Sequence, residues 1–333
     1  MTKNIKIETP NGGYAEVIQH SVSPEGKEII TFSVKYGLIV HSEWIRHRLL
    51  SNSVKSNRAV SMKQIRKEVI EDPYVPIKFG GQQAGMVAID EDQFGYAKVC
   101  RWLWKNSRWG AVGVHWLFEK LKLHKEITNR ILNPWQWVRS TTTATDYDNF
   151  YKLRLHKDAQ KDINVIAKAM HEALQLSEPM LINAGEYHVP YVSRRRTGNG
   201  ELEYYDSDGT QLNTQQAIEA SCARCARSSY DNHDGTKASY FNRATAKGRS
   251  DQEIYQDLIN SDPVHGSCGE HQATPLVVAY KNKKPIYPAG MTHVSVEDGI
   301  LTTKYWSGNL LGFIQHRQTT KGHVCWDYRV KTE

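Results

Sequence analysis

The stretch WIRHRLLSNSVKSNR, residues 44–58, places three arginines and a histidine among serine and asparagine side chains. It covers about four helical turns' worth of chain. Arginine presents a rigid fork of donors that binds phosphate or the edge of a planar base. Serine hydroxyls and backbone N–H groups complete such an anion site. The alternative is a solvated basic helix edge. We expect a helix to open near Arg46 in either case.

Outward from this stretch, strands and helices alternate. Residues 14–40 alternate apolar and polar side chains around a Ser-Pro-Glu-Gly turn, which predicts strands. Residues 72–90 are rich in proline and glycine and read as a loop. Residues 93–131 carry four tryptophans among helix formers. Val112, Trp116 and Leu117 fit helical spacing, so we expect a buried helix here, ended by Pro134.

The second half of the chain continues the mixture. Residues 146–176 predict a long helix whose apolar stripe is Ile163, Ile166, Met170 and Leu174. Residues 179–213 look hairpin-like, with Arg194–Arg196 in a solvated loop or, alternatively, near a phosphate tail. Residues 214–230 and 251–260 predict helices, and 273–333 returns to strands. The fold class is therefore α/β (α+β), a mixed antiparallel sheet with long helices. We expect one domain, 1–333, made of a half at 1–178, an insertion at 179–213 and a half at 214–333.

Composition favours a globular protein with anionic partners. The chain has 333 residues, a net charge of +7 and a pI near 9.0. That charge suits nucleotides or nucleic acid and does not choose between them. No apolar run reaches the roughly 20 residues of a membrane helix, and the N-terminus lacks the apolar core of a signal peptide. Five cysteines, an odd number, predict reduced thiols in a cytoplasm.

Common nucleotide and hydrolase motifs are absent from the sequence. There is no Walker loop, no Gly-x-Gly-x-x-Gly after a strand and no Gly-x-Ser-x-Gly elbow. Cys222-x-x-Cys225 and His265-x-x-Cys268-x-x-His271 do have zinc-ligand spacing. However, the cysteine pair lies in a helical run, where a zinc knuckle needs a tight turn. We expect no metal and keep a zinc-stabilised module as an alternative.

Four segments resemble one enzyme family. Arg46-His47-Arg48, seven residues and Ser56 match the signature of the flavin-dependent thymidylate synthases (ThyX). Residues 149–154, Asn-Phe-Tyr-Lys-Leu-Arg, are similar to the family's Asn-Phe-x-x-Leu-Arg stretch. Residues 226–230 and 265–271 are similar to its Ala-Arg-x-Ser and His-x-Ser-Pro-Phe-Glu-His segments, with Cys-Gly in place of Pro-Phe. Arg130, before Asn-Pro, matches a family arginine ahead of Leu-Pro.

The order of these segments differs from that of the family. The family usually begins with the Ala-Arg-x-Ser and His-x-Ser segments, whereas this chain carries them last. The resemblance is therefore to a circularly permuted, bacteriophage-type member, and its location would be the host cytoplasm if a phage encodes it. Permutation is tolerated where the natural termini lie close together at the surface.

The resemblance implies an activity and its cofactors. Such an enzyme is a homotetramer that methylates dUMP at C5 without an enzyme nucleophile. Methylenetetrahydrofolate (the 5,10 form) gives the carbon, reduced FAD gives the hydride, and NADPH reduces the flavin. Arg154 would be the catalytic residue, set against the uracil N3/O2 edge where negative charge grows. The implied dUMP-binding residues are Glu43, Arg46, Ser56, Asn57, Arg58, Arg130 and Arg154. The implied FAD-binding residues are Arg46, His47, Arg48, Asn149, Ser229, His265, Ser267 and Glu270.

Several positions depart from the family pattern. Val54 stands where Glu is usual, Glu43 where Gln is frequent, and Thr143 and Thr145 where Asn-Ala-Arg is usual. A carboxylate at 43 would repel a phosphate unless it pairs with an arginine such as Arg46. These changes leave other readings open: a methylase or hydroxymethylase of another pyrimidine deoxynucleotide such as dCMP, or an inactive relative. A basic nucleic-acid-binding protein is the alternative from another class, and no membrane partner is expected.

Overall fold

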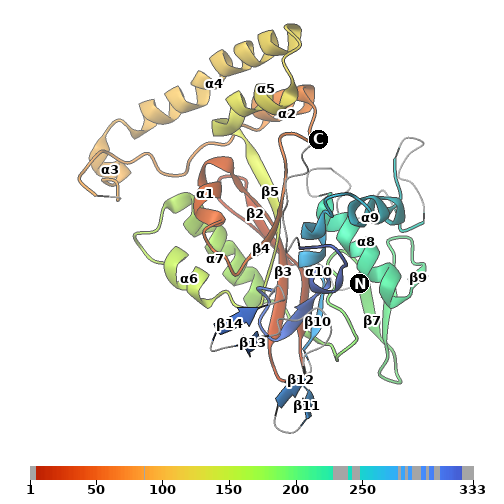
Figure 1. Ribbon diagram of the computed structural model, residues 1–333. Helices are drawn as coiled ribbons and strands as arrows, with labels where there is room; N and C mark the ends of the chain where they lie inside the picture. Colours follow the sequence, from red (N-terminus) through yellow and green to blue (C-terminus); the bar gives the residue numbers. More distant parts are fainter. Residues whose placement is uncertain are drawn as a thin grey trace.

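An antiparallel sheet forms the centre of the protein. The computed structural model describes residues 5–85, 87–227, 239–241, 248–276, 279–281, 284–286, 294–297, 300–303 and 308–324. The sheet has the order β1-β2-β3-β5-β4, with a short β6 parallel to β2 (Figure 1). Its strands are β1 (Ile5–Glu8), β2 (Tyr14–Val22), β3 (Glu28–Gly37), β4 (Ser51–Val54), β5 (Trp137–Ala144) and β6 (Met180–Leu181). The predicted mixed α/β class with an antiparallel sheet is confirmed.

One face of this sheet is apolar and lies under helix α7 (Lys161–Gln175). Side chains alternate between the two faces of a strand, so Phe32 and Val34 of β3 both point toward α7. From the helix, Ile163, Ile166 and Met170 are buried against them, as the stripe predicts. Burial of each such side chain contributes roughly 1.5–3 kcal/mol. This contact makes the largest apolar cluster of the described chain.

The opposite face of the sheet is rich in hydroxyl groups. It is covered by residues 187–192, helix α8 (Thr214–Ala226) and the 3₁₀ helix η3 (Gly266–Glu270), all from the second half of the chain. A β-bulge between Val17 and Gln19 turns the end of β2 toward this face. The hydroxyl-bearing residues are Ser21, Thr31, Ser33, Thr141, Thr143, Ser51 and Ser53. The two halves therefore meet through a polar layer.

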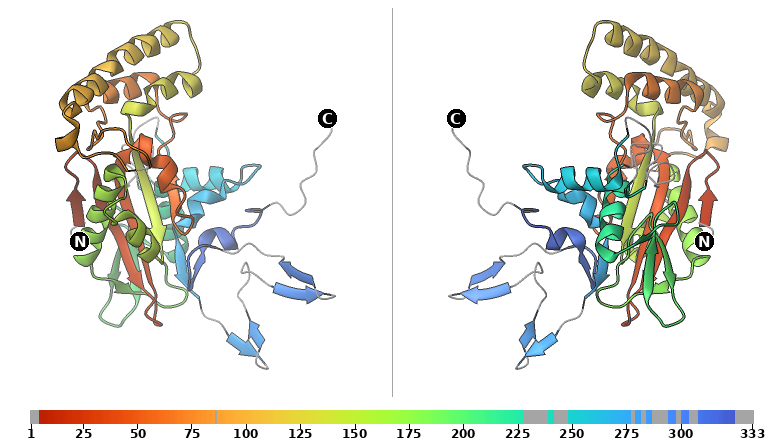
Figure 2. Two further views of the ribbon diagram at one scale, coloured as in Figure 1. Left: turned by 90° about the vertical axis from the view of Figure 1, so that its left-hand side faces the viewer. Right: turned by 90° about the vertical axis from the view of Figure 1, so that its right-hand side faces the viewer.

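Beyond one end of the sheet lies a group of helices that contradicts the expected burial. It holds α2 (Met62–Glu71), α4 (Ala97–Lys120), α5 (Lys125–Thr128) and the 3₁₀ helix η2 (Asn129–Trp135) (Figure 1). On α4, Trp116 and Leu117 are 47% and 51% exposed, so the predicted burial of both is wrong. The helix instead buries a mixed face: Ala111 and Val112 pack against an apolar cluster, and His115 bonds both Arg66 and Asn129 at 3.2 Å. Figure 2 shows α4 along the outer edge of the protein.

Other boundaries also differ from the expectations. Helix α1 (His41–Trp44) ends before Arg46, so the Arg46 segment forms turns rather than opening a helix. Pro134 lies inside η2, and α4 already ends at Lys120. The expected helix 146–176 is two helices, α6 (Asp148–Arg154) and α7. The break is stabilised by Asn164, whose amide donates to the Arg154 carbonyl at 2.7 Å.

The rest of the second half follows the prediction more closely. Strands β7 (Ser193–Arg196), β8 (Leu202–Tyr205) and β9 (Gln211–Leu212) form an antiparallel sheet, which confirms the hairpin-like segment. Helix α8 confirms the expected helix 214–230 up to Ala226, and helix α9 (Asp251–Ile259) confirms the expected helix 251–260. The remaining elements are η1 (Leu38–Val40), α3 (Glu91–Phe94), α9 (Asp251–Ile259), β10 (Ala273–Pro275), β11 (Ala279–Lys281), β12 (Lys284–Ile286), β13 (Val294–Glu297), β14 (Ile300–Thr303), β15 (Phe313–Gln315) and α10 (His316–Thr319).

The three consecutive arginines do not form a solvated loop. Arg194 is half-buried and donates to the Ser21 hydroxyl at 2.9 Å. Arg195 pairs with Glu203 across the hairpin, and Arg196 pairs with Glu186. The segment is a strand in which each guanidinium has a partner within the chain, although Arg195 itself is exposed. Within the described part of the chain, no helix combines the length and the apolar character needed to span a bilayer.

Candidate active site

Trp44 anchors the Arg-His-Arg segment to the core. Its ring is fully buried, stacks on Tyr36 with centroids 4.7 Å apart and meets Phe150 edge-on at 5.4 Å. Its indole N–H donates to the Asn52 side chain at 2.9 Å. Leu50 is buried at the other end of the segment. The turn between these two anchors leaves the side chains of Arg46 and Arg48 exposed to solvent.

Arg154 lies against His47, as the resemblance requires for a shared site. Its Nε donates to His47 Nε2 at 2.9 Å, and an Nη donates to the Glu43 carbonyl at 3.3 Å. Burial and the nearby Arg154 lower the pKa of His47 to about 4, so the ring is neutral and accepts the bond. The Arg154 guanidinium stays charged, since arginine is not deprotonated in proteins. One face of this cation remains available to a ligand, because the side chain is only half-buried.

Glu43 balances the charge of this set. Its carboxylate accepts from Ser42 at 2.9 Å, and its charge acts on Arg154 in the direction that raises the arginine's pKa. Burial and Arg46 act in the opposite direction on the same pKa. The structure records no ion pair between Glu43 and Arg46, both of which it describes. The carboxylate therefore compensates Arg154, and Arg46 is left as an exposed cation.

A second set lies at the other end of β4. Arg58 is 68% exposed and its Nε lies 3.8 Å from the Glu126 carboxylate, while Arg130 Nε donates to the Glu126 carbonyl at 3.1 Å. Asn57 donates to Asn133 at 2.9 Å, which fixes the turn. Ser56 and Arg58 are exposed beside it. In the sequence, β4 lies between this set and the His47 side of the Arg154 set.

The third set comes from η3 and brings the second half of the chain to β4. His265 and Ser267 are exposed at its start. The Glu270 side chain is paired with Arg317. Gln315 donates to the Glu270 carbonyl at 2.9 Å and to the Ser51 hydroxyl at 3.2 Å. The η3 segment is thus held directly beside the Arg-His-Arg segment.

Two predicted site residues stay outside these sets. Asn149 is exposed in the first turn of α6, and no described contact joins it to the cationic side chains. Ser229 lies outside the described residues. Asn309 was not predicted as a site residue. It donates to the Arg48 carbonyl at 3.4 Å and accepts from the Ser51 hydroxyl at 3.0 Å. A run of Ser-Gly-Asn in a polar loop gives no signal for this, because the contact is entirely tertiary.

The two threonine departures have structural roles. Thr143 is buried between Thr31, at 2.6 Å, and His271, at 2.9 Å. Thr145 accepts from the Leu311 backbone N–H at 2.8 Å. Both residues attach the second half of the chain to β5 or to the turn that follows it. Val54 packs against the apolar core.

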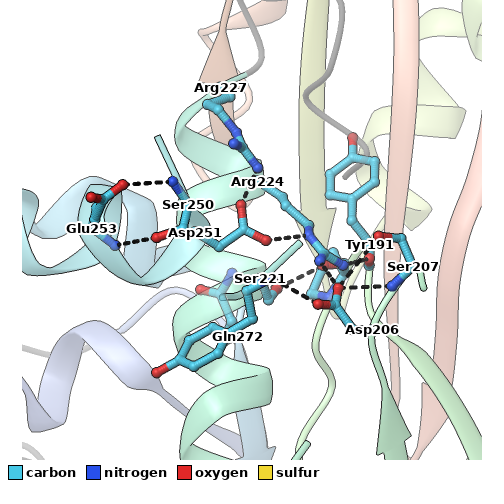
Figure 3. Close-up of polar contacts among 12 residues, drawn as sticks. Tyr191, Asp206, Ser207, Ser221, Arg224, Arg227, Ser250, Asp251, Glu253 and Gln272 are labelled. Carbon is cyan, nitrogen blue, oxygen red and sulfur yellow. Dashed lines mark hydrogen bonds and ion pairs between the residues drawn. The ribbon is translucent and has the colours of Figure 1, made fainter. Parts of the chain in front are cut away.

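A buried ion-pair network holds the second half together (Figure 3). Arg224 donates to Asp251 at 2.9 Å and also pairs with Asp206, and the three side chains are at most 1% exposed. Arg227 pairs with the other oxygen of Asp251. Arg224 also donates to the Tyr191 carbonyl at 2.6 Å. The network joins α8, α9 and the segment that covers the polar face of the sheet.

The cysteine and histidine spacing does not form a metal site. Among the described residues, no group of three or more histidine, cysteine, aspartate or glutamate side chains is placed to hold a metal ion. Cys222, Cys225 and Cys268 are buried free thiols, and Cys222 and Cys225 lie within helix α8 as expected. His271 is not available as a ligand, since both of its ring nitrogens are hydrogen-bonded.

Buried histidines make stability sensitive to acid. Burial lowers the pKa of His316, which contacts the Tyr255 hydroxyl at 2.9 Å, to about 4. The unfolded chain has the ordinary value near 6.5 and takes up a proton first, so folding stability falls as the pH drops from about 7 toward 4. We expect His316 to lower the unfolding free energy by on the order of 2 kcal/mol between pH 7 and pH 5. Urea unfolding at both pH values measures this loss, and the His316→Gln variant should show a smaller one; equal losses in both proteins would contradict it.

Comparison with known proteins agrees with the sequence resemblance. Residues 19–180 match the Thy1 family model, described as thymidylate synthase complementing protein. No curated protein matches the chain by sequence. A solved structure, a UMP/dUMP methylase PolB from Streptomyces cacaoi bound with 5-Br dUMP, is 15% identical, with a TM-score of 0.40 over 53% of this chain and 93% of that one. A TM-score of that size does not establish a shared fold.

The matched residues contain the two sets of cationic side chains that the structure places along β4. Arg46, His47 and Arg154 lie inside the match, and so do Arg58 and Arg130. The third set, from η3, lies beyond it. The family match supports the expectation of a methyltransferase-type enzyme. Residues 19–180, just under half of the chain, are therefore similar to the Thy1 family.

Proposed function

We propose that the protein is a flavin-dependent thymidylate synthase that methylates dUMP at C5. The observation that carries the proposal is the position of Arg154, held by His47 and the Glu43 carbonyl beside the exposed Arg46. A guanidinium fixed in this way stabilises the negative charge that grows on the N3/O2 edge of an activated uracil. Because His47 is neutral, it accepts the hydrogen bond from Arg154 and places no second positive charge beside the guanidinium.

The residues present fit an anionic dinucleotide such as FAD. Arg46 and Arg48 offer exposed guanidiniums, and His265 and Ser267 offer an exposed ring and hydroxyl. These side chains would hold the cofactor's phosphates and ring edges, together with Ser229 and Asn149 if the resemblance holds there. When bound and reduced, FAD supplies a hydride. NADPH and methylenetetrahydrofolate are proposed as co-substrates on the family resemblance.

Arg58, Arg130 and Ser56 would bind the nucleotide phosphate. A single bound nucleotide that uses both sets would place its base at Arg154 and its phosphate at these residues. The circular order of the motifs stays a prediction. It is supported by the contact between η3 and β4, which brings the late His-x-Ser segment beside the early Arg-His-Arg segment.

The first experiment is to purify the protein natively and identify its chromophore. We expect stoichiometric FAD, and we expect its absorption spectrum to shift on titration with dUMP. A shift with dCMP in place of dUMP would assign the other pyrimidine as substrate. A colourless protein that takes up neither added FAD nor dUMP would reject the proposal. In that case a nucleic-acid-binding function would be the next hypothesis to test. The contacts of Arg194–Arg196 within the chain remove one of the observations that supported it.

Arg58 is expected to act in binding rather than chemistry. Replacing it with alanine removes one charge-assisted contact to a phosphate, worth about 1.5–3 kcal/mol. The dissociation constant of dUMP should therefore rise about 10–100-fold while FAD binding is unchanged. Isothermal titration of dUMP into the FAD-loaded variant measures this. Arg249→Ala, which removes an exposed arginine just before helix α9, is the matched control and should bind as the wild type does.

The proposed enzyme is expected to be an oligomer, the family's homotetramer. Trp102, Trp109 and Trp116 recur every seven residues on α4, so they share one face, and all three are exposed. We expect a second copy to cover this row of tryptophans. Light scattering should give a multiple of the 38.1 kDa chain mass, and Trp109→Glu should lower it. A wild type that stays monomeric at micromolar concentration would count against the homotetramer.

A further inference from the structure

A continuous chain of hydrogen bonds crosses the polar face of the sheet. His188 joins β2 to β3, since its Nδ1 lies 2.7 Å from the Ser21 hydroxyl and its Nε2 lies 2.8 Å from the Thr31 hydroxyl. Thr31 and Thr143 then join β3 to β5 by a direct contact of 2.6 Å between their hydroxyls. Each link is buried, so no solvent competes for these bonds.

The chain continues from β5 to β4 through a second histidine. His271 Nδ1 lies 2.9 Å from the Thr143 hydroxyl, and its Nε2 lies 2.9 Å from the Ser53 hydroxyl. A backbone bridge between His188 and Ala273 fixes the two histidine segments against each other. Burial lowers the pKa of both rings, to about 3 for His271, so both are neutral near pH 7. A neutral ring donates from one nitrogen and accepts at the other.

Arg194 sets the direction in which hydrogen bonds are donated along this chain of side chains. Its guanidinium has only donors, and it donates to the Ser21 hydroxyl at 2.9 Å. The hydrogen of Ser21 then has one described acceptor, His188 Nδ1. If the chain ran the other way, that hydrogen would be buried without an acceptor, at a cost of about 1–3 kcal/mol. Ser21 is fully buried, so water does not relieve this cost. The direction from Arg194 outward is therefore favoured.

The remaining donors follow in order. His188 donates from Nε2 to Thr31, Thr31 donates to Thr143, and Thr143 donates to His271 Nδ1. His271 then donates from Nε2 to Ser53. The Ser53 hydroxyl has accepted this bond, and its own hydrogen has no acceptor among its described contacts. Ser53 is half-buried on β4, between the Arg-His-Arg segment and Ser56.

We propose that Ser53 is a ligand-binding residue whose hydroxyl is fixed as a hydrogen-bond donor by the chain that starts at Arg194. The group that it recognises is an acceptor oxygen, a carbonyl or a phosphate oxygen of the bound nucleotide or of the flavin. His271, His188 and Arg194 are positioning residues, because they act through Ser53 and touch no ligand themselves. The choice of ligand rests on the proposed function, whereas the direction of the chain does not.

The direction is tested first, on the wild-type protein without added ligand. Nitrogen-15 NMR of histidine-labelled protein distinguishes the two neutral tautomers, with the signals assigned through His188→Gln and His271→Gln. We expect both rings to carry hydrogen on Nε2. In Arg194→Leu the direction is no longer imposed and a mixture of tautomers is expected, whereas Arg194→Lys retains a cationic donor and the wild-type pattern. Hydrogen on Nδ1 of either ring in the wild type overturns the proposal.

The ligand is then identified by titrating dUMP and FAD separately. In Ser53→Ala the dissociation constant of one of them should rise about 3–10-fold, the size of one uncharged hydrogen bond. The affinity for the other ligand should be unchanged, as should both affinities in the control Ser107→Ala on α4, and the thermal midpoint of Ser53→Ala should fall because the buried His271 Nε2–H loses its acceptor. Unchanged affinity for both ligands overturns the role of Ser53. A wild type that binds neither ligand defeats the proposed function and the role of Ser53 together, while the tautomers still report the direction of the chain.

Discussion

Replacing Arg154 with alanine is expected to lower the rate of dTMP formation about 100- to 1,000-fold while FAD stays bound. Arg154 is the cation that the structure fixes most firmly within the Arg-His-Arg set, through His47 and the Glu43 carbonyl. Removing one preorganised donor that points at developing negative charge typically lowers the rate of an enzyme by this factor. FAD binding should survive, because Arg46 and Arg48 do not depend on Arg154 for their position.

Product chromatography of dTMP and the absorbance of bound flavin give the two readouts. Arg195→Ala, which removes an exposed arginine of the β7–β8 hairpin, is the matched control and should keep full activity. An independent readout is the pKa of His47, which should rise from about 4 because the lowering effect of Arg154 is gone. Near-normal turnover in a variant with the expected His47 pKa would show that Arg154 is correctly placed but has no catalytic role.

The largest loss of stability is expected for Asp251→Ala. Asp251 is fully buried and neutralises both Arg224 and Arg227, so its removal leaves two buried cations with one remaining described carboxylate, Asp206, between them (Figure 3). Breaking a buried ion pair by removing one partner costs about 3–5 kcal/mol. The effect should spread to the Tyr191 segment, because the same arginine holds its carbonyl.

Urea unfolding followed by circular dichroism measures this loss. Asp257→Ala is the control on the same helix, since its pair with Arg249 is exposed and is worth at most about 1 kcal/mol. A single Asp251→Ala variant as stable as the wild type would mean that water already compensates these cations.

The sequence by itself determined the local elements and the residue types of the site. Period-2 alternation in 14–40 and the stripe of Ile163, Ile166 and Met170 depend on neighbours along the chain, and the structure has them as predicted. The Arg-His-Arg and Asn-Phe-x-x-Leu-Arg motifs were recognisable because their spacing is local. The contact between them, through His47 and Arg154, is a tertiary feature of the structure.

Only the tertiary structure decided which faces are buried and which polar groups meet. Helical spacing predicts that Trp116 and Leu117 are buried, but both are exposed, whereas their neighbour His115, bonded to Arg66 and Asn129, is buried. From the sequence, Arg194 is predicted to be a surface cation; in the structure it donates to Ser21, which is far away in the sequence. The Arg194–Ser21 contact joins residues 173 positions apart. Contacts of this kind leave no periodic pattern in the sequence, because each depends on the packing of two separate segments.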